Sequence, residues 1–476
     1  MIPKPITKSK ILIDPFYPTF LWKEALVVVL LITFQRLGQP ASIITALGLV
    51  MLSLRSSKGA VQALTLVTLL SYLNYFYFPV GFNGAAKWIV LLSASTAGIF
   101  HSYRAAKDGP KQDTRWLIPL LLFIVVAGIS SAVTSADPEM ALFKLFTFSV
   151  GALGAMYVLG SVDLSLPYIT SWFYTIWVVI VLLSAPLVKF GNGYIANSNF
   201  FMGILSHSQA FATFVIPIAL YLILRWLVGL KLSIWHKAIT LLGLYLVYLS
   251  ISRTGGFSFL LALIAVAFVY YARGASGAMV RARLIPRLAA VVGVIIILNI
   301  LTSGSLGELA GVFSHKYGEK MDVMATRSNS VTAAQRTFEK YPLLGKGFGL
   351  AMEGESFAIK RDPILRLPIS APVEAGVIYL AAPAQLGIVG TLFLLLFMYI
   401  YLAPLFTRGM APFIGLAAVC FFINFGEYVF FATGGVGMYH WLLYGLAYSV
   451  AVRHPEVFHL HRDVVWKEVM ICQRTT

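Results

Sequence analysis

The sequence predicts an all-α polytopic membrane protein with about 12 to 14 transmembrane helices and one long extracytoplasmic loop. Of its 476 residues, 59% are hydrophobic and only 12% are charged. Apolar runs long enough to span a bilayer recur from end to end, which excludes the soluble globular classes. The lysines and arginines gather in the short connections between these runs, as in membrane proteins with a fixed orientation.

Fourteen apolar segments are expected to form membrane helices, of which the first two are short. Their approximate bounds are 21–34, 41–54, 61–80, 86–100, 117–134, 141–160, 168–187, 201–224, 238–252, 256–272, 288–302, 377–404, 411–426 and 437–452. The basic segment before Pro15 and Pro18 lacks the pattern of a cleavable signal. The first helix is therefore expected to remain as an anchor.

The basic residues also predict the orientation of the chain. With the N-terminus in the cytoplasm, the inside connections are rich in Lys and Arg, whereas outside connections such as Ser135–Glu139 are poor in them. Both termini are therefore expected in the cytoplasm, and the loop 303–376 outside. The formal charge of +17 follows from this orientation and does not indicate nucleic-acid binding.

The apolar segments and the long loop divide the chain into four regions. These are N-terminal transmembrane helices (1–190), a core that includes the extracytoplasmic loop (191–404), C-terminal transmembrane helices (405–452) and a basic cytoplasmic tail (453–476). Cys420 lies in an apolar run and Cys472 in the tail, so neither a disulfide framework nor a metal cluster is predicted. The outside loops hold no D-x-D pair, and Walker and G-x-S-x-G motifs are lacking, so no metal or other cofactor is expected.

The stretch Arg327–Gly349 lies in the long loop and predicts an amphipathic helix followed by a strap rich in turns. The apolar stripe of the helix consists of Val331, Ala334, Phe338 and Tyr341. This helix is expected to start at Arg327, to end before Pro342 and to lie across the membrane-embedded body. Glycines at 345, 347 and 349 predict the turns of the strap. Arg327 is either a solvated surface arginine or a ligand contact, and Arg336 is a candidate for a further contact to an anionic substrate.

Arg253 closes the ninth apolar segment at its outside end. A charge at this depth needs a partner or a function. Either the side chain snorkels to lipid headgroups, or it lines a polar pocket with Ser250, Ser252 and Thr254. A fixed guanidinium in such a pocket suits a phosphate group.

Four more polar residues lie toward the outside of the apolar segments. His207 and Gln209 form a cluster at the start of the eighth segment that indicates either a functional cavity or a packing contact between helices. Glu374 precedes the twelfth segment, where it either accepts a proton from an attacking hydroxyl or pairs with a loop arginine. Gln385, a candidate substrate-binding residue, lies near the start of that segment. It precedes Gly387, which together with Gly390 is expected to form a small-residue face for tight helix packing.

In this order, the segments GILSHSQAFA, SISRTGG, PLLGKGFG with an arginine ahead of it, and QLGIVGT resemble the O-antigen ligase and polymerase superfamily. The resemblance covers about residues 190 to 400. It implies that Arg253 and Arg327 hold the diphosphate of an undecaprenyl-linked glycan. It also matches His207 and Gln209 to the superfamily's His-Pro-Asn position, with Ser208 in place of the proline and Gln209 in place of the asparagine, and implies that His207 and Gln209 bind substrate.

The sequence departs from the ligases of this superfamily at two places. Gly376 and Val377 stand where the ligases have a His-Asn pair, and Gln385 replaces their usual glutamate. The polymerases vary more at this site, so the departures favour a polymerase. Glu374, two residues before the missing histidine, is a candidate proton acceptor.

The resemblance implies a metal-independent, inverting glycosyltransferase of the bacterial inner membrane. Its substrate would be an undecaprenyl-diphosphate-linked oligosaccharide within the lipid bilayer, transferred to a glycan hydroxyl to extend a cell-surface or exopolysaccharide. A chain-length regulator is an expected partner. The alternatives are a ligase that joins glycan to lipid A core or protein, a small-anion transporter and a scaffold for polysaccharide export. The sequence shows no pair of interrupted helices in corresponding halves, which argues against the transporter.

Overall fold

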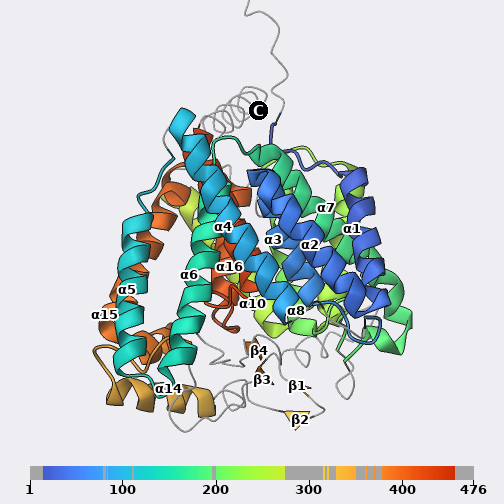
Figure 1. Ribbon diagram of the computed structural model, residues 1–476. Coiled ribbons are helices and arrows are strands. Elements are labelled where there is room, and N and C mark those ends of the chain that lie inside the picture. Colours follow the sequence, from blue (N-terminus) through green and yellow to red (C-terminus); the bar gives the residue numbers. More distant parts are fainter. Residues whose placement is uncertain are drawn as a thin grey trace, which may run out of the picture.

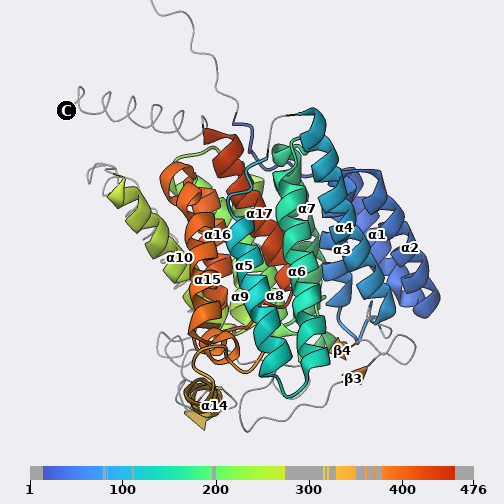
Figure 2. The ribbon, with the colours of Figure 1, turned by 60° about the vertical axis from the view of Figure 1, so that its left-hand side comes forward.

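The computed structural model is a bundle of helices that run along a common axis, with one helix lying across an end of the bundle (Figures 1 and 2). The residues that the structure describes are 14–78, 82, 84–109, 112–195, 200–273, 315–316, 319–320, 328–349, 360–361, 368–370 and 378–455. Within this part of the chain, the regular structure is helical except for two pairs of very short strands.

The α-helices are α1 (Trp22–Phe34), α2 (Gln39–Arg55), α3 (Ser57–Ser71), α4 (Ala85–Asp108), α5 (Leu117–Val133), α6 (Pro138–Gly160), α7 (Leu166–Ser184), α8 (Ser208–Leu227), α9 (Ile234–Leu249), α10 (Arg253–Ala272), α14 (Ser328–Lys340), α15 (Ile378–Arg408), α16 (Ala411–Ile423) and α17 (Gly437–Arg453). The short 3-10 helices are η1 (Gln35–Leu37), η2 (Ala185–Lys189) and η3 (Gly191–Gly193). Strand β1 (His315–Lys316) pairs antiparallel with β2 (Glu319–Lys320), and β3 (Lys360–Arg361) pairs antiparallel with β4 (Pro368–Ser370).

Thirteen of the fourteen expected apolar segments coincide with helices, and 288–302 lies outside the described residues. Five described helices are long and apolar enough to cross a membrane, namely α6, α7 continued to Lys189, α8, α10 and α15. Helices α2, α5, α9 and α16 are apolar but shorter. Apart from the two strand pairs, the described part of the chain is therefore helical, with segments that can span a membrane.

Two of the expected segments have a wrong boundary, in both cases at the end of the bundle where α14 lies (Figure 1). The segment expected to reach residue 80 ends at Ser71, and the one expected to start at residue 201 starts at Ser208. The residues in between form turns around the buried Asn74, whose side chain donates to the carbonyls of Asn192 and Gly203, both at 2.9 Å. The hydrogen bonds to Asn74 satisfy polar backbone groups of these turns. The turns can therefore be buried even though their sequence is apolar enough to predict a helix.

The interior of the bundle is centred on α8, in which nearly every residue is buried. It packs against α7, α9, α10 and α16. Other helices expose large apolar side chains on their outer faces, for example Leu47, Ile118, Phe268 and Leu392. An apolar exterior around an apolar core is typical of a bundle surrounded by lipid.

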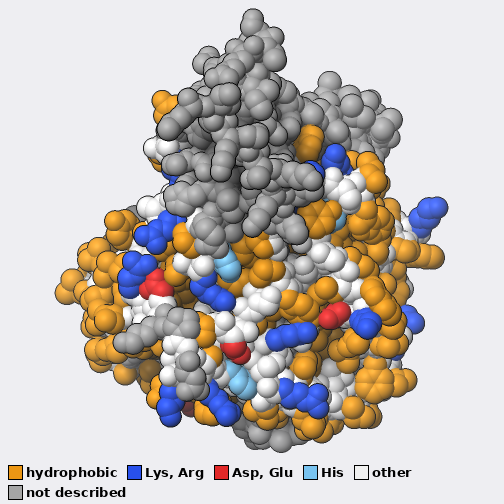
Figure 3. All heavy atoms as spheres, turned by 90° about the horizontal axis from the view of Figure 1, so that it is seen from above, with side chains coloured by type: hydrophobic (Ala, Val, Ile, Leu, Met, Phe, Trp, Pro, Cys, Tyr) orange, Lys and Arg blue, Asp and Glu red, His pale blue; other side chains and the backbone are white. Residues whose placement is uncertain are grey.

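One end of the bundle holds both ends of the described chain. The guanidinium of Arg225 is fully buried there, pairs with Asp14 and donates to the carbonyl of Phe16 at 3.0 Å. The ring of Phe16 packs edge-on against His454, with 5.3 Å between centroids. Figure 3 shows lysine and arginine side chains gathered on this end.

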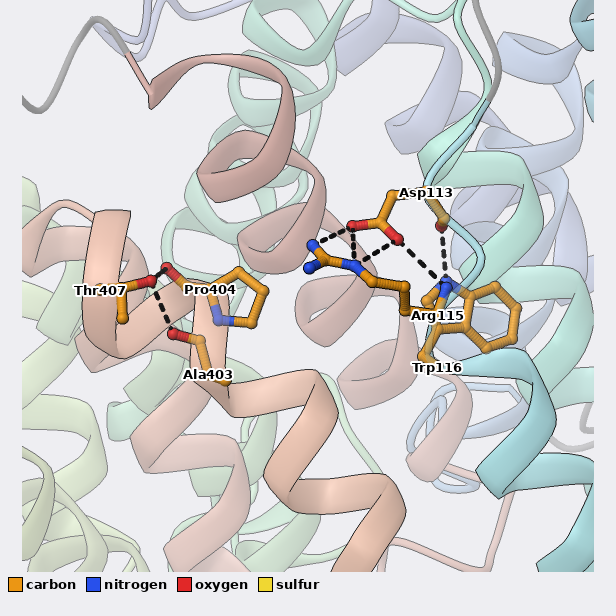
Figure 4. Close-up of polar contacts among 6 residues, drawn as sticks. All are labelled: Asp113, Arg115, Trp116, Ala403, Pro404 and Thr407. Carbon is orange, nitrogen blue, oxygen red and sulfur yellow. Dashed lines mark hydrogen bonds and ion pairs between the residues drawn. The ribbon is translucent and has the colours of Figure 1, made fainter.

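The connection before α5 lies at the same end, where α15 also terminates (Figure 4). Arg115 pairs with Asp113 at 2.6 Å, and the Trp116 indole donates to the Asp113 carbonyl at 3.1 Å. Burial opposes ionisation of the Asp113 carboxyl, but the hydrogen bonds from Arg115 outweigh burial, so the pKa lies below its usual range. On the last turn of α15, Thr407 donates to the carbonyl of Ala403 at 2.9 Å.

Candidate functional site

Helix α14 lies across the opposite end of the bundle, beneath α5 and α15 in Figure 1. Ala333 and Ala334 of α14 pack against Ala381 and Ala384 of α15. The apolar stripe in the sequence therefore predicted the helix and its buried face, and the helix ends two residues before Pro342. The predicted first residue, Arg327, lies outside the described residues. The side chain of the exposed Arg336 lies on α14.

Helix α15 is interrupted at Gly387, where the backbone takes φ +63°. We call residues 342–349 the strap, because they pass through this break. The amide of Ile388 donates to the carbonyl of Pro342 at 2.8 Å, and that of Val389 to the carbonyl of Leu343 at 3.3 Å. Gly387, which was expected to allow tight helix packing, does allow a close backbone approach, but to the strap and at a break in the helix.

The strap also donates to α15 in the reverse direction. The amide of Lys346 donates to the carbonyl of Ala384, and that of Gly347 to the carbonyl of Gln385, both at 3.0 Å. A helix break leaves amides and carbonyls without helical partners, and in an apolar environment each such group is costly. The strap provides partners for groups on both sides of the break.

The close approach of the two backbones depends on glycine at both places. A Cβ at Gly345 would lie 2.2 Å from the carbonyl carbon of Gln385, and a Cβ at Gly387 would lie 2.2 Å from the oxygen of Leu343. Gly345 also has φ +73°. The sequence predicted turns at the strap glycines, and the structure confirms this prediction.

Side chains from α5 and α6 hold the strap in place. Thr134 donates to the carbonyl of Gly345 at 2.6 Å, and Ser131 accepts from the amide of Phe348 at 3.0 Å. The ammonium of Lys144 donates to the last strap carbonyl at 2.5 Å. These anchors were not among the predicted residues. The available signal was a group of hydroxyls, together with one lysine, inside apolar runs.

The strap also carries an apolar anchor. Phe348 is buried, and its ring lies 5.3 Å from that of Phe148 and 5.1 Å from that of Phe431, measured between centroids. Burial of an aromatic ring of this size contributes on the order of 2 to 3 kcal/mol. The strap is therefore a packed part of the bundle.

We call the contact between the strap and the break in α15 the joint. Gln385, predicted to bind substrate, lies at the centre of the joint and is 1% exposed. Its Oε1 accepts from the amide of Gly349 at 3.1 Å and from the hydroxyl of Tyr428. The side chain therefore links α15, the strap and the turn after α16.

Arg253 is the first residue of α10. One of its terminal nitrogens, Nη2, is buried and has no hydrogen-bond partner among the described residues. Two residues earlier, Ile251 has φ +50°, the one positive φ outside glycine in the described chain. A left-handed backbone costs a β-branched residue about 1 to 2 kcal/mol and is often found near functional sites.

The hydroxyls near Arg253 form hydrogen bonds with other groups of the described residues. Ser250 donates back to Val247 at 2.6 Å, and Ser252 caps α10 by accepting from Gly255 at 3.3 Å. Thr254 donates to Glu427 at 3.2 Å. Short hydroxyl side chains bond readily to nearby backbone groups, and whether these three residues line a pocket with Arg253 stays a prediction.

His207 caps the N-terminus of α8, where its Nδ1 accepts from the amide of Gln209 at 3.2 Å. The imidazole is exposed, and Gln209 is half-buried. Both residues therefore lie at the start of the helix, as predicted.

A chain of contacts connects the first turn of α10 to the strap. Thr254, next to Arg253, bonds to Glu427, and the neighbouring Tyr428 bonds to Gln385 at the joint. Arg327 and Glu374 lie outside the described residues, so their positions relative to Arg253 stay predictions. Within the described residues, no group of three His, Cys, Asp or Glu side chains is placed to hold a metal ion.

Comparison with known protein families finds no matching family, and comparison with curated proteins finds no similar sequence.

Proposed function

We propose that this protein is a glycosyltransferase of the bacterial inner membrane that extends a cell-surface or secreted polysaccharide. It transfers an oligosaccharide from undecaprenyl diphosphate to a glycan hydroxyl at the extracytoplasmic face. The proposal includes about 12 to 14 membrane-spanning helices and both termini in the cytoplasm. The gathering of lysine and arginine on the end that holds both ends of the described chain supports this orientation.

The observation that carries the proposal is the buried Nη2 of the half-buried Arg253, which has no hydrogen-bond partner among the described residues. Burying a cationic group without a partner is costly, so an anionic ligand would stabilise it. The fork of a guanidinium matches the oxygens of a phosphate. Arg253 is also at the N-terminus of a 20-residue helix, where the backbone dipoles favour negative charge.

The chemistry places few demands on the protein, because a diphosphate is already a good leaving group. The acceptor oxygen attacks the anomeric carbon from the face opposite the diphosphate, so the bond to the diphosphate breaks and the configuration inverts. Arg253 stabilises the charge that develops on the leaving diphosphate. By the family resemblance, Arg327 supplies the second positive charge, and Arg336 on the exposed face of α14 attracts the anionic substrate.

The joint between the strap and α15 argues against a transporter of small anions. In transporters, broken helices direct their freed backbone groups at the substrate. Here Ile388 and Val389, the first amides after the break, bond to the strap. A ligase would use the same donor and leaving group, and it would differ in the acceptor.

The test uses lipid-linked oligosaccharide purified from a strain that lacks this gene, together with the full-length protein in nanodiscs. Gel electrophoresis and mass spectrometry follow the products. We expect repeat units to be joined by the wild type, and we expect the rate to fall by at least about a hundredfold in Arg253→Ala and Arg327→Ala.

Arg253→Lys should also be slow, because a point charge does not replace the fork. Arg408→Ala, which changes an exposed arginine at the end of α15, is the matched control. Normal chain lengths in both alanine variants would remove the enzymatic proposal. Transfer only to lipid A core would assign the ligase, and uptake of labelled anion unaffected by the oligosaccharide would support the transporter.

A further inference from the structure

The starts of α1 and α9 lie close together at the end of the bundle opposite α14. The ring of His236, in the first turn of α9, donates from Nε2 to the carbonyl of Pro18 at 2.8 Å. The ring of Tyr17 packs edge-on against the same imidazole, with 5.1 Å between centroids. The amide of Leu21, directly before α1, donates to the hydroxyl of Thr175 in α7 at 3.0 Å. These contacts fix the segment that leads into α1 on the first turn of α9, with both helices packed against α7.

Large apolar side chains are exposed at both helix starts. Trp22, the first residue of α1, is 63% exposed, and Trp235 of α9 is 47% exposed. Ile234, beside Trp235, is 81% exposed. Indole rings are enriched where the hydrocarbon of a bilayer meets its headgroups, because the ring is apolar and its N–H is polar. The two indoles therefore place both helix starts at the depth of the lipid headgroups.

Exposed lysines accompany these rings, namely Lys23 of α1, Lys231 ahead of α9 and Lys237 of α9. On these two helices and the described segments that lead into them, the acidic residues are Asp14 and Glu24. Asp14 is neutralised by the buried Arg225, whereas Glu24 accepts from the hydroxyl of Tyr168 at 2.9 Å. Three positive charges thus face one negative charge. The N-termini of both helices add a partial positive charge, so the surface favours an anion.

The outer faces of the two helices become apolar beyond the lysines. On α1, Leu26 and Leu30 are 53% and 58% exposed, and they follow Lys23 on the same face over about 10 Å of helix. On α9, Leu241 is 43% exposed and lies one turn beyond Lys237 on the same face. Cations, indole rings and aliphatic side chains therefore follow one another in the order of the phosphate, glycerol region and acyl chains of a phospholipid.

We propose that Lys23, Lys231 and Lys237, together with Trp22 and Trp235, form a binding site for an anionic phospholipid of the surrounding membrane. The lysines bind the phosphate as point charges, and the acyl chains lie along the outer faces of α1 and α9. Each lysine close to a membrane surface favours an anionic lipid by about fivefold. The site lies at the opposite end of the bundle from the candidate functional site and does not depend on the transfer reaction.

Titration of the full-length protein in detergent, followed by native mass spectrometry, tests the site. The probe is phosphatidylglycerol, and the comparison lipid is phosphatidylcholine with the same acyl chains and no net charge. We expect the wild type to bind phosphatidylglycerol at least about tenfold more tightly than phosphatidylcholine. This preference should fall below about threefold in the triple variant Lys23→Gln, Lys231→Gln and Lys237→Gln, whose exposed side chains can change without loss of packing.

The matched control is the triple variant Arg55→Gln, Arg104→Gln and Lys107→Gln, which removes the same charge from exposed residues of α2 and α4 at the same end of the bundle. It should keep the wild-type preference. An equal loss in both triple variants would show that only the overall surface charge attracts the lipid, and it would overturn the proposal. An unchanged preference in the lysine variant would do the same. Displacement of the lipid by millimolar inorganic phosphate would assign the lysines to a soluble anion instead.

Discussion

Gly345→Ala tests whether the strap holds the site together. The new Cβ would lie 2.2 to 2.3 Å from backbone atoms of Gln385 and Leu386, which cannot move aside as a flexible side chain can. While the strap stays in place, the left-handed backbone at φ +73° costs about 1 to 2 kcal/mol in addition to the clash. Clash and strain are relieved only if the strap leaves the break and gives up its four backbone hydrogen bonds with α15. At about 0.5 to 1.5 kcal/mol each, the loss of these bonds gives an expected destabilisation of roughly 2 to 6 kcal/mol.

Hydrogen exchange followed by mass spectrometry measures this effect directly, because opening of the strap exposes its amides. With the protein in nanodiscs, the strap amides at Lys346–Gly349 should exchange at least about thirtyfold faster in Gly345→Ala than in the wild type. Polymer synthesis should fall in parallel. Gly191→Ala is the matched control, because a Cβ there meets no atom within 4 Å. Unchanged exchange of the strap in Gly345→Ala would refute the joint.

Three more variants test the surrounding contacts. Arg225→Ala leaves Asp14 without its buried partner, so we expect the protein to lose about 3 to 5 kcal/mol of stability. Thermal unfolding in nanodiscs measures this loss, and a value below about 1 kcal/mol would show that the Arg225–Asp14 ion pair contributes little. Tyr428→Phe removes one donor from the joint, so exchange of the strap should rise by about three- to tenfold, and an unchanged rate would show that the bond contributes nothing. Because the folded pKa of Asp113 is depressed by Arg115, its contribution is present at neutral pH and is lost as the pH falls below about 4. Asp113→Asn should therefore lower the melting temperature slightly at pH 7, and this loss should shrink as the pH falls through the acid range; an equal shift at every pH would contradict this.

The positions of the helices and the buried face of α14 could be predicted from the sequence, because both depend on periodicity within one segment. Ala334 lies on the expected face of α14, and Pro342 marks where the helix must already have ended. The ends of α3 and α8 could not be predicted. Their turns are stabilised by Asn74, which bonds to residues more than a hundred positions away.

The sequence predicted which kinds of residue the candidate site contains, but it did not predict how they contact one another. The sequence indicated that the charge of Arg253 needs a partner or a function. The burial of its Nη2 without a partner among the described residues is consistent with this. The sequence did not predict the contact between Glu427 and Thr254, because these residues lie 173 positions apart and only the packing of Gly426 on Thr254 brings them together.

The break in α15 and the strap explain each other. Gly387 in a continuous apolar run reads as part of a helix, and the carbonyl and amide groups that it frees would be unstable in lipid. The strap alone is equally unstable, since its glycines leave it with little local structure. Each segment supplies the partners that the other lacks, so the break forms only together with the strap. The part of α15 before Gly387 therefore packs with α14 at the candidate site, whereas the part after Gly387 packs within the bundle.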